Sequence, residues 1–435
     1  MTSSFDTSDS VAPTSVSSLP LSDRDRGRLQ RRTLLVLSAS AVAGRAAMTI
    51  AFVVVSLLTK EILGSSTWAG IASAAITVGT ALSSSALSSY MNRRGRRPGL
   101  VVGYMVAAAG GLIAAFGGQA ALIVAYLVGL VLFGVGQGST GLARYAAADL
   151  ANDKDRGKAI GYVVFASTIG AVGGPALSGP AARFGEWFGY GPYIGSHLVS
   201  VGFFVLAGLL LFVGLRPDPL VASGKLDVEG PKRDGGFGAG MQAIRSHPLA
   251  MLALVGLVIS QAVMVMVMAM TPLHMEAHGK SVGLVGWVLS AHTAGMFAFA
   301  PLAGWFADRY GRIESIVLSA MVLIVATVMT AFAHEAPSNL MFPGLYLLGL
   351  GWSFGTVGSS ALLTEAVDGR EEVAAQGAAD LIKSFVSGAG ALASGFIFTM
   401  AGFPILSMVG IVGSGLLLVA AFTRLRLRPR IGLAP

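Results

Sequence analysis

The chain has 435 residues, of which 54% are hydrophobic and only 12% are charged. Soluble domains carry about 25% charged residues, and the mean hydropathy of this chain is +0.72. A soluble fold would leave too much apolar surface in water, and a disordered chain would be more polar. The absence of cysteine excludes disulfides and thiolate metal sites. The composition therefore predicts a polytopic membrane protein.

Twelve stretches are long and apolar enough to cross a bilayer as helices, which takes roughly 20 residues each. They run over about 33–59, 67–90, 98–118, 120–145, 157–181, 192–214, 248–273, 282–306, 314–333, 339–365, 374–399 and 402–423. They are too long and continuous for the strands of a β-barrel. The predicted fold is an all-α integral membrane protein with twelve transmembrane helices.

The basic residues indicate the orientation of these helices, because Lys and Arg concentrate in cytoplasmic loops. With the N-terminus inside, 25 of the 30 basic residues fall on the cytoplasmic side and three on the other. We therefore expect a multi-pass protein of the plasma or inner membrane with both termini cytoplasmic. Residues 1–32 and 425–435 are expected to form tails, the first of them disordered. Lipid headgroups account for the net charge of +8, so no nucleic-acid partner is expected.

The second half of the chain repeats features of the first at a spacing of 216 residues. The matched pairs include Gly70 and Gly286, Gly95 and Gly311, Arg96 and Arg312, Gly161 and Gly377, Gly174 and Gly390, and Gly179 and Gly395. We predict two six-helix halves, at 33–215 and 248–424, joined by a cytoplasmic linker at 216–247. Parallel repeats of this kind are one plan of secondary transporters, in which substrate binds between the halves.

The loop after the eighth span reads Gly304-Trp-Phe-Ala-Asp308-Arg309-Tyr-Gly311-Arg312. It resembles the G-x3-D-R-x-G-R/K signature of the major facilitator superfamily, and the resemblance covers about residues 30–424. The superfamily implies twelve helices in two six-helix repeats and transport by alternating access.

The first half carries altered versions of two further signatures. Between the second and third spans, Asn92 replaces the acid, while Arg93, Gly95 and Arg96 remain. In the fourth span, Gln137 is present, but Gly134 stands where the superfamily has an arginine.

The fifth span carries Gly170-x3-Gly174-Pro175-x3-Gly179. This pattern resembles the superfamily's antiporter signature, which is found mostly in proton-coupled exporters. Small residues let another helix approach closely, and proline bends the helix. The signature is expected to form a seam that closes the cavity against proton leak, or to serve ordinary helix packing.

The resemblance implies a charge latch that stabilises one of the alternating states. Its expected members are Asn92, Arg93, Gly95, Arg96, Asp149, Asp308, Arg309, Gly311 and Arg312. Asp149 and Glu365 are the expected acidic partners, since they lie at the ends of the fourth and tenth helices, on the same side of the membrane. The alternative is that these arginines only anchor the protein to lipid headgroups.

Ionisable residues within membrane spans are costly and by default face a cavity or a partner. Arg45 lies near the middle of the first span and shares a helical face with Thr49 and Phe52. It can hold a carboxylate of the substrate, or it forms a structural ion pair. The expected substrate cavity comprises Arg45, Thr49, Phe52, Thr77, Gln137, Gln261, His292 and Trp352.

Asp380 and Lys383 share one face of the eleventh span. Asp380 is the best candidate for a protonatable carboxylate that couples protons to solute, with Lys383, His292 and Glu365 as further candidates. The alternatives are a self-satisfied Asp380–Lys383 pair, a helix-bridging hydrogen bond from His292, and a latch role for Glu365.

No nucleotide-binding or metal-binding motif occurs in the sequence, so we expect no cofactor, no metal and no enzyme activity. His274, Glu276 and His278 cluster beyond the seventh span, but their spacing offers no closed site and we interpret them as a solvated rim. The predicted function is proton-coupled efflux of amphipathic small molecules or drugs by a monomer. The alternatives are transport of a small organic anion bound by Arg45, and a receptor or scaffold.

Overall fold

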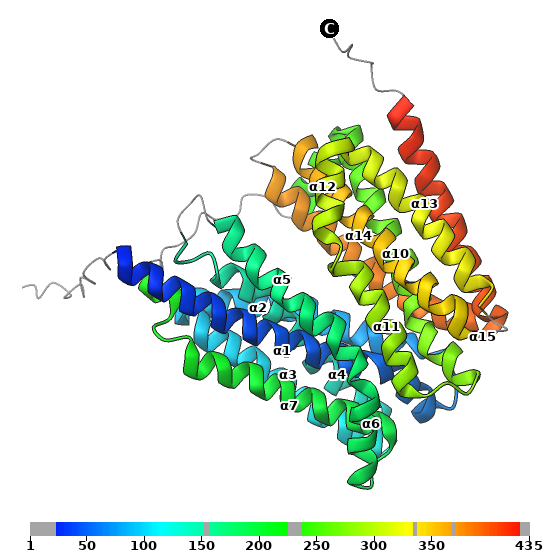
Figure 1. Ribbon diagram of the computed structural model, residues 1–435, viewed down its shortest axis with the longest axis horizontal. Coiled ribbons are helices and arrows are strands. Elements are labelled where there is room, and N and C mark those ends of the chain that lie inside the picture. Colours follow the sequence, from blue (N-terminus) through cyan, green and yellow to red (C-terminus); the bar gives the residue numbers. More distant parts are fainter. Residues whose placement is uncertain (1–22, 152–155, 225–236, 334–336, 368–370, 427–435) are drawn as a thin grey trace, which may run out of the picture.

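The computed structural model describes residues 23–151, 156–224, 237–333, 337–367 and 371–426. Every regular element in these ranges is a helix (Figure 1). Residues 1–22 and 427–435 of the expected tails therefore fall outside the described residues. The rest of both tails is helical: the first helix begins at Asp23, ten residues before the first span, and the last ends at Arg426. Residues 225–236 of the expected linker also lie outside them, whereas 216–224 and 237–247 are described.

The first half consists of seven helices. They are α1 (Asp23–Leu63), α2 (Gly70–Arg94), α3 (Arg96–Gln119), α4 (Ile123–Ala146), α5 (Arg156–Ala176), α6 (Ser178–Trp187) and α7 (Pro192–Gly214). Here α6 continues α5 with a break at Leu177, beyond Pro175. Two short helices follow in the linker region, α8 (Pro219–Ala222) and α9 (Phe237–Ser246).

The second half consists of six helices. They are α10 (Pro248–Ala277), α11 (Val282–Phe297), α12 (Ala300–Tyr310), α13 (Arg312–Ala331), α14 (Pro337–Ala366) and α15 (Glu372–Arg426). The last is interrupted at Gly402, where φ is +79°, so α15 contains two helices that meet at a sharp bend. It covers both the eleventh and the twelfth expected spans.

Eleven helical segments of the described residues are long and apolar enough to cross a membrane, and the segment Ala374–Leu425 spans 52 residues. Because this segment bends at Gly402, the arrangement is consistent with twelve crossings. Backbone N–H and C=O groups find no water to bond with in the hydrocarbon core of a bilayer. A long apolar segment that crosses it therefore forms a helix, which pairs these groups within the segment. The all-helical prediction is confirmed.

The glycines of the loop signatures make the turns that the sequence predicted. Gly95 separates α2 from α3 with φ +99°, and Gly311 separates α12 from α13 with φ +123°. Side chains other than glycine are strained at these angles. The signature thus joins two antiparallel helices through a single residue.

The two halves meet at one end of the molecule and diverge at the other (Figure 1). At the joined end α5 packs on α11, and α2 packs on α15. Gly286 there lies against the Pro175 carbonyl, and Gly70 lies against the Ala391 carbonyl. Both members of the second contact are offset by 216 residues from those of the first. The two contacts are therefore one contact made twice by the internal repeat.

Candidate functional site

The expected cavity residue Arg45 lies at the boundary between the two halves. Its guanidinium carbon is 6.0 Å from the ring centroid of Phe297, which belongs to α11 of the opposite half. Arg45 is half-buried, and its guanidinium makes no hydrogen bond or ion pair with any described residue. The structural ion pair that was the alternative is therefore not formed among these residues.

Two other expected cavity residues connect to Arg45 through Phe297. The rings of Phe297 and Trp352 meet edge to face with centroids 5.9 Å apart. The indole nitrogen of Trp352 donates to Gln261 Oε1 at 2.9 Å. Helices α1, α11, α14 and α10 thus place a cation, two aromatic rings and an amide in series at the boundary between the halves. Phe297 was missed because one more aromatic residue in an apolar span gives no distinctive signal.

The remaining expected cavity residues form local contacts or none. Thr49 donates to the carbonyl oxygens of Arg45 and Gly170, so its hydroxyl serves the α1–α5 contact. Thr77 donates to the carbonyl of Ser73 within α2. Phe52 and Gln137 are half-buried, and Gln137 makes no hydrogen bond to a described residue.

His292 is fully buried in α11, where its Nδ1 lies 2.9 Å from the carbonyl oxygen of Leu345 in α14. Its Nε2 has no partner among the described residues. The ring therefore bridges two helices of the second half, as the alternative reading expected.

The signature arginines form ion pairs with the two expected acids. Arg312 lies 2.8 Å from Glu365 Oε1 and 2.7 Å from Asp308 Oδ1. In the first half, Arg96 donates to both carboxylate oxygens of Asp149, at 2.8 and 3.3 Å. The two pairings are again related by the offset of 216 residues. Arg93 and Arg309 are exposed.

The altered first signature has an acid from elsewhere in the chain. The Asn92 side chain lies outside the described residues, but Asp218 of the linker accepts a hydrogen bond from the backbone N–H of Arg97 at 2.7 Å. Its carboxylate lies beside Gly95, at the N-terminus of α3, where a negative charge is favourable. Its other oxygen caps α8. Sequence reasoning missed Asp218, since it is 126 residues away from Asn92.

The antiporter-like signature of α5 lies between α1 and α11. Gly170 and Gly174 face α1, where an added Cβ would overlap the Val42 carbonyl and the Thr49 hydroxyl. Gly179 faces Gly283 of α11, across the boundary between the halves. Gly179 belongs to α6, the continuation of α5. These small residues therefore hold α5 tightly against α1, and α6 tightly against α11.

Asp380 and Lys383 of α15 form an ion pair of 2.8 Å, in which the Asp380 side chain is 70% exposed. Asp380 is three helical turns from Ala391, which contacts α2 at the joined end. The pair therefore lies on the side of α15 that faces the first half, toward the diverging end.

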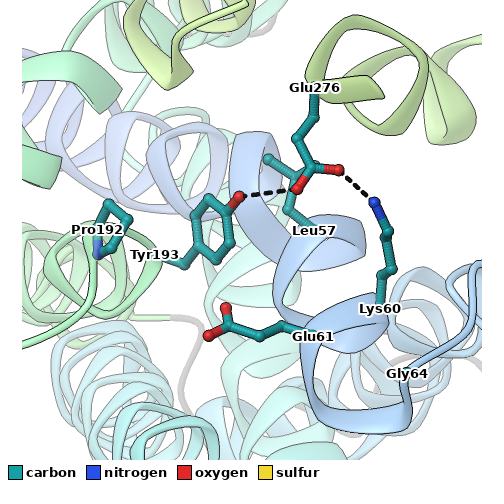
Figure 2. Close-up of a pocket in the computed structure, with 7 residues that line it drawn as sticks. All are labelled: Leu57, Lys60, Glu61, Gly64, Pro192, Tyr193 and Glu276. Carbon is teal, nitrogen blue, oxygen red and sulfur yellow. Dashed lines mark hydrogen bonds and ion pairs between the residues drawn. The ribbon is translucent and has the colours of Figure 1, made fainter. Parts of the chain in front are cut away.

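At the joined end a second charged cluster links the halves. Lys60 of α1 pairs with Glu276 of α10 at 2.6 Å, and the Tyr193 hydroxyl donates to the same carboxylate at 3.3 Å. With Glu61 these residues line a pocket of about 420 Å³ (Figure 2). Glu276 is thus an inter-half partner, whereas the sequence suggested a solvated rim. Among the described residues no group of three metal-ligating side chains occurs.

A family model described as Major Facilitator Superfamily matches residues 36–282 and 253–434. The chain belongs to the major facilitator superfamily. An uncharacterized MFS-type transporter of Bacillus subtilis strain 168, YdeG, is 32% identical over 409 residues, which are 94% of this chain and 95% of the relative. The riboflavin transporter RfnT of Brucella anthropi is 27% identical over 81% of this chain and 85% of that protein.

Solved superfamily structures share the fold at low sequence identity. A variant of the nucleoside transporter NupG matches with a TM-score of 0.73 at 13% identity, over 91% of this chain and 100% of that one. A bacterial homologue of the human lysosomal transporter Spinster matches with a TM-score of 0.70 at 15% identity, over 95% and 100%. The family model and the relatives show that the protein is a membrane transporter of this superfamily, whose members bind small-molecule substrates.

The superfamily's fourth-helix arginine has no room in this protein. An added Cβ at Gly134 would overlap the carbonyl of Ile76 in α2, and Thr80 donates to the Gly134 carbonyl at 3.0 Å. In the middle of the boundary between the halves, a cation is present instead at Arg45 of α1.

Proposed function

We propose that this superfamily member is a proton-coupled exporter of amphipathic small molecules, working as a monomer by alternating access. The observation that carries the proposal is the packing of the α5 signature. Gly170 and Gly174 seat α5 on α1 within the first half. Against α11 of the opposite half, Pro175 of α5 meets Gly286, and Gly179 of α6 meets Gly283. A tight seam between the halves is what an antiporter needs, because an unsealed pathway would dissipate the proton gradient.

The distribution of basic residues supports an orientation with the diverging end in the cytoplasm and the joined end outside. In this orientation, the diverging end is the side from which we expect substrate to reach the central residues. Arg96 and Arg312 lie at the cytoplasmic end, where their ion pairs with Asp149 and Glu365 act as the latch. The two six-helix halves and the linker move as separate units in this mechanism.

Proton coupling is assigned to the Asp380–Lys383 pair. The pair is exposed toward the diverging end, so a proton from the cytoplasmic side can reach Asp380. Protonation would release Lys383 and change the charge of the surface that approaches α2 when this end closes. Glu365 is engaged by Arg312, and His292 by Leu345, which makes both less available as carriers.

A second candidate is transport of a small organic anion in either direction. The observation that favours it is the lack of a counter-ion for Arg45 among the described residues. The relative named as a riboflavin transporter adds support for a polar, aromatic metabolite as substrate.

Purified protein in liposomes tests the proposal. An imposed pH gradient should drive accumulation of amphipathic compounds, and a gradient of about 100 mV equivalent supplies roughly 2.3 kcal/mol per proton. Asp380→Asn should abolish this driven accumulation while leaving exchange of labelled for unlabelled substrate intact. Unchanged accumulation in that variant would remove Asp380 from coupling, and solute flux that ignores the pH gradient would refute proton coupling itself.

A further inference from the structure

The centre of the boundary between the halves carries an uncompensated positive charge. The helices around Arg45 contain few acids: α4 and α11 have no Asp or Glu. In α10 the acid, Glu276, is next to the last residue, and in α14 Glu365 holds the same place. The acids of α1 likewise lie near its two ends. No described carboxylate is therefore positioned to pair with Arg45.

An isolated guanidinium at this depth selects the charge of whatever binds beside it. Arginine keeps its proton under all ordinary conditions, and its field is weakly screened away from water. A cationic amphiphile would meet like-charge repulsion there. An anionic group would instead gain a charge-assisted and, for a carboxylate, a bidentate hydrogen bond.

The opposite half supplies aromatic surface at the same place. Phe297 lies against the guanidinium at 6.0 Å and meets Trp352 edge to face. The hydrogen bond from Trp352 to Gln261 fixes the indole ring at one edge and leaves its faces apolar. Aromatic rings attract further rings in stacked or edge-to-face geometry at about 4.5–7 Å between centroids.

We propose that the transported substrate is a flat aromatic molecule with a carboxylate or comparable anionic group. The anion pairs with Arg45 of the first half, and the ring packs on Phe297 and Trp352 of the second. This proposal rests on the proposed transport function and names its substrate class. When substrate is absent, the Phe297 ring lies against the Arg45 guanidinium. When substrate binds, the same ring selects aromatic over aliphatic anions.

Binding to the purified protein, followed by quenching of tryptophan fluorescence, tests this without any transport. Three probes share one ring system and differ in charge: 2-naphthoate, 2-naphthalenemethanol and 2-naphthylmethylammonium. Trp352→Phe identifies the part of the signal that arises at the site, since the chain has five tryptophans. The wild-type protein should bind the naphthoate at least about tenfold more tightly than the ammonium probe, as expected for one charge-assisted pair.

Two variants separate the roles of charge and ring. Arg45→Gln should weaken naphthoate binding by about tenfold or more, with Arg309→Gln as a control that removes an exposed arginine. Phe297→Leu should weaken naphthoate by about threefold to tenfold, and leave cyclohexanecarboxylate, the aliphatic comparison, unchanged.

Equal binding of the three naphthyl probes, or no binding of the anion, would overturn the proposal even with no variant made. Tighter binding of cyclohexanecarboxylate than of naphthoate would overturn its aromatic part. These outcomes are independent of proton coupling: an absent response to a pH gradient would refute the proposed export mechanism and leave the charge preference of the site standing.

Discussion

The ion pair between Lys60 and Glu276 should hold the joined end closed. Its atoms lie 2.6 Å apart, but the two side chains are 39% and 33% exposed, so solvent screens their attraction (Figure 2). Such a pair contributes about 1 kcal/mol at most, and the hydrogen bond from Tyr193 adds about 1 kcal/mol. Glu276→Gln should shift the ratio of outward-open to closed molecules about fivefold, and Glu276→Ala about thirtyfold, since 1.4 kcal/mol is about tenfold.

A single introduced thiol measures this shift, because the natural chain contains no cysteine. Ser178 is buried at the joined end, where its hydroxyl donates to the carbonyl of Val282 in the opposite half at 3.1 Å. Ser178→Cys should react slowly with a membrane-impermeant maleimide added outside. Glu276→Gln should speed the reaction about fivefold, in line with the loss of about 1 kcal/mol.

The charge-swapped double variant Lys60→Glu/Glu276→Lys should restore slow labelling, because the ion pair reforms with reversed polarity. Glu61→Gln is the matched control, since Glu61 lines the same pocket without joining the ion pair. Equal labelling rates in Glu276→Gln and Glu61→Gln would refute the role of the Lys60–Glu276 pair in holding the joined end closed. A swapped variant as reactive as the single variants would do the same.

Three further changes test other contacts. Arg312→Gln should reduce transport more than Asp308→Asn at equal expression. The arginine contacts two acids and a carbonyl oxygen, whereas the Asp308 side chain is 73% exposed. Equal transport rates in the two variants would count against the cytoplasmic latch. Gly286→Ala should favour opening of the joined end, because overpacking there costs about 1–3 kcal/mol. The same thiol labelling measures the effect. Gly173→Ala is the control, since its added Cβ would meet nothing within 4 Å. Gln261→Leu should raise KM and lower Tm, since an indole N–H without an acceptor costs about 1–3 kcal/mol.

The membrane fold could be predicted from the sequence because long apolar segments in hydrocarbon can satisfy their backbone hydrogen bonds only as helices. Length and hydropathy alone mark the spans, and positive-φ glycines at Gly95 and Gly311 could be placed from their signatures. The ends of the helices could not be predicted in this way. The apolar signal stops near residue 33, yet α1 continues back to Asp23, since polar residues also form helix once a span has nucleated it.

The site could be predicted in part. Polar groups stand out in apolar spans, so Arg45, Gln261 and Trp352 could be singled out, and the structure brings the three into one series of contacts. That they bind substrate stays a prediction. Phe297 and Asp218 could not be found in this way. Phe297 is an ordinary residue of an apolar span. Asp218 acts at the turn between α2 and α3, more than a hundred residues away in the sequence. Only the packing of the helices reveals the contacts of these two residues.

Ion pairs at the diverging end form within each half, whereas the Lys60–Glu276 pair at the joined end connects the two halves. This difference bears on which conformational state is favoured. Arg96 and Arg312 are satisfied by Asp149 and Glu365 of their own halves, and Asp218 occupies the α3 terminus beside the altered signature. Closing the diverging end therefore gains nothing from these arginines unless they exchange partners. The ion pair that crosses between the halves in the described residues, Lys60–Glu276, lies at the joined end. Without substrate, charge pairing thus favours the state seen here, and an anion bridging Arg45 and the opposite half is the added interaction that can draw the diverging ends together.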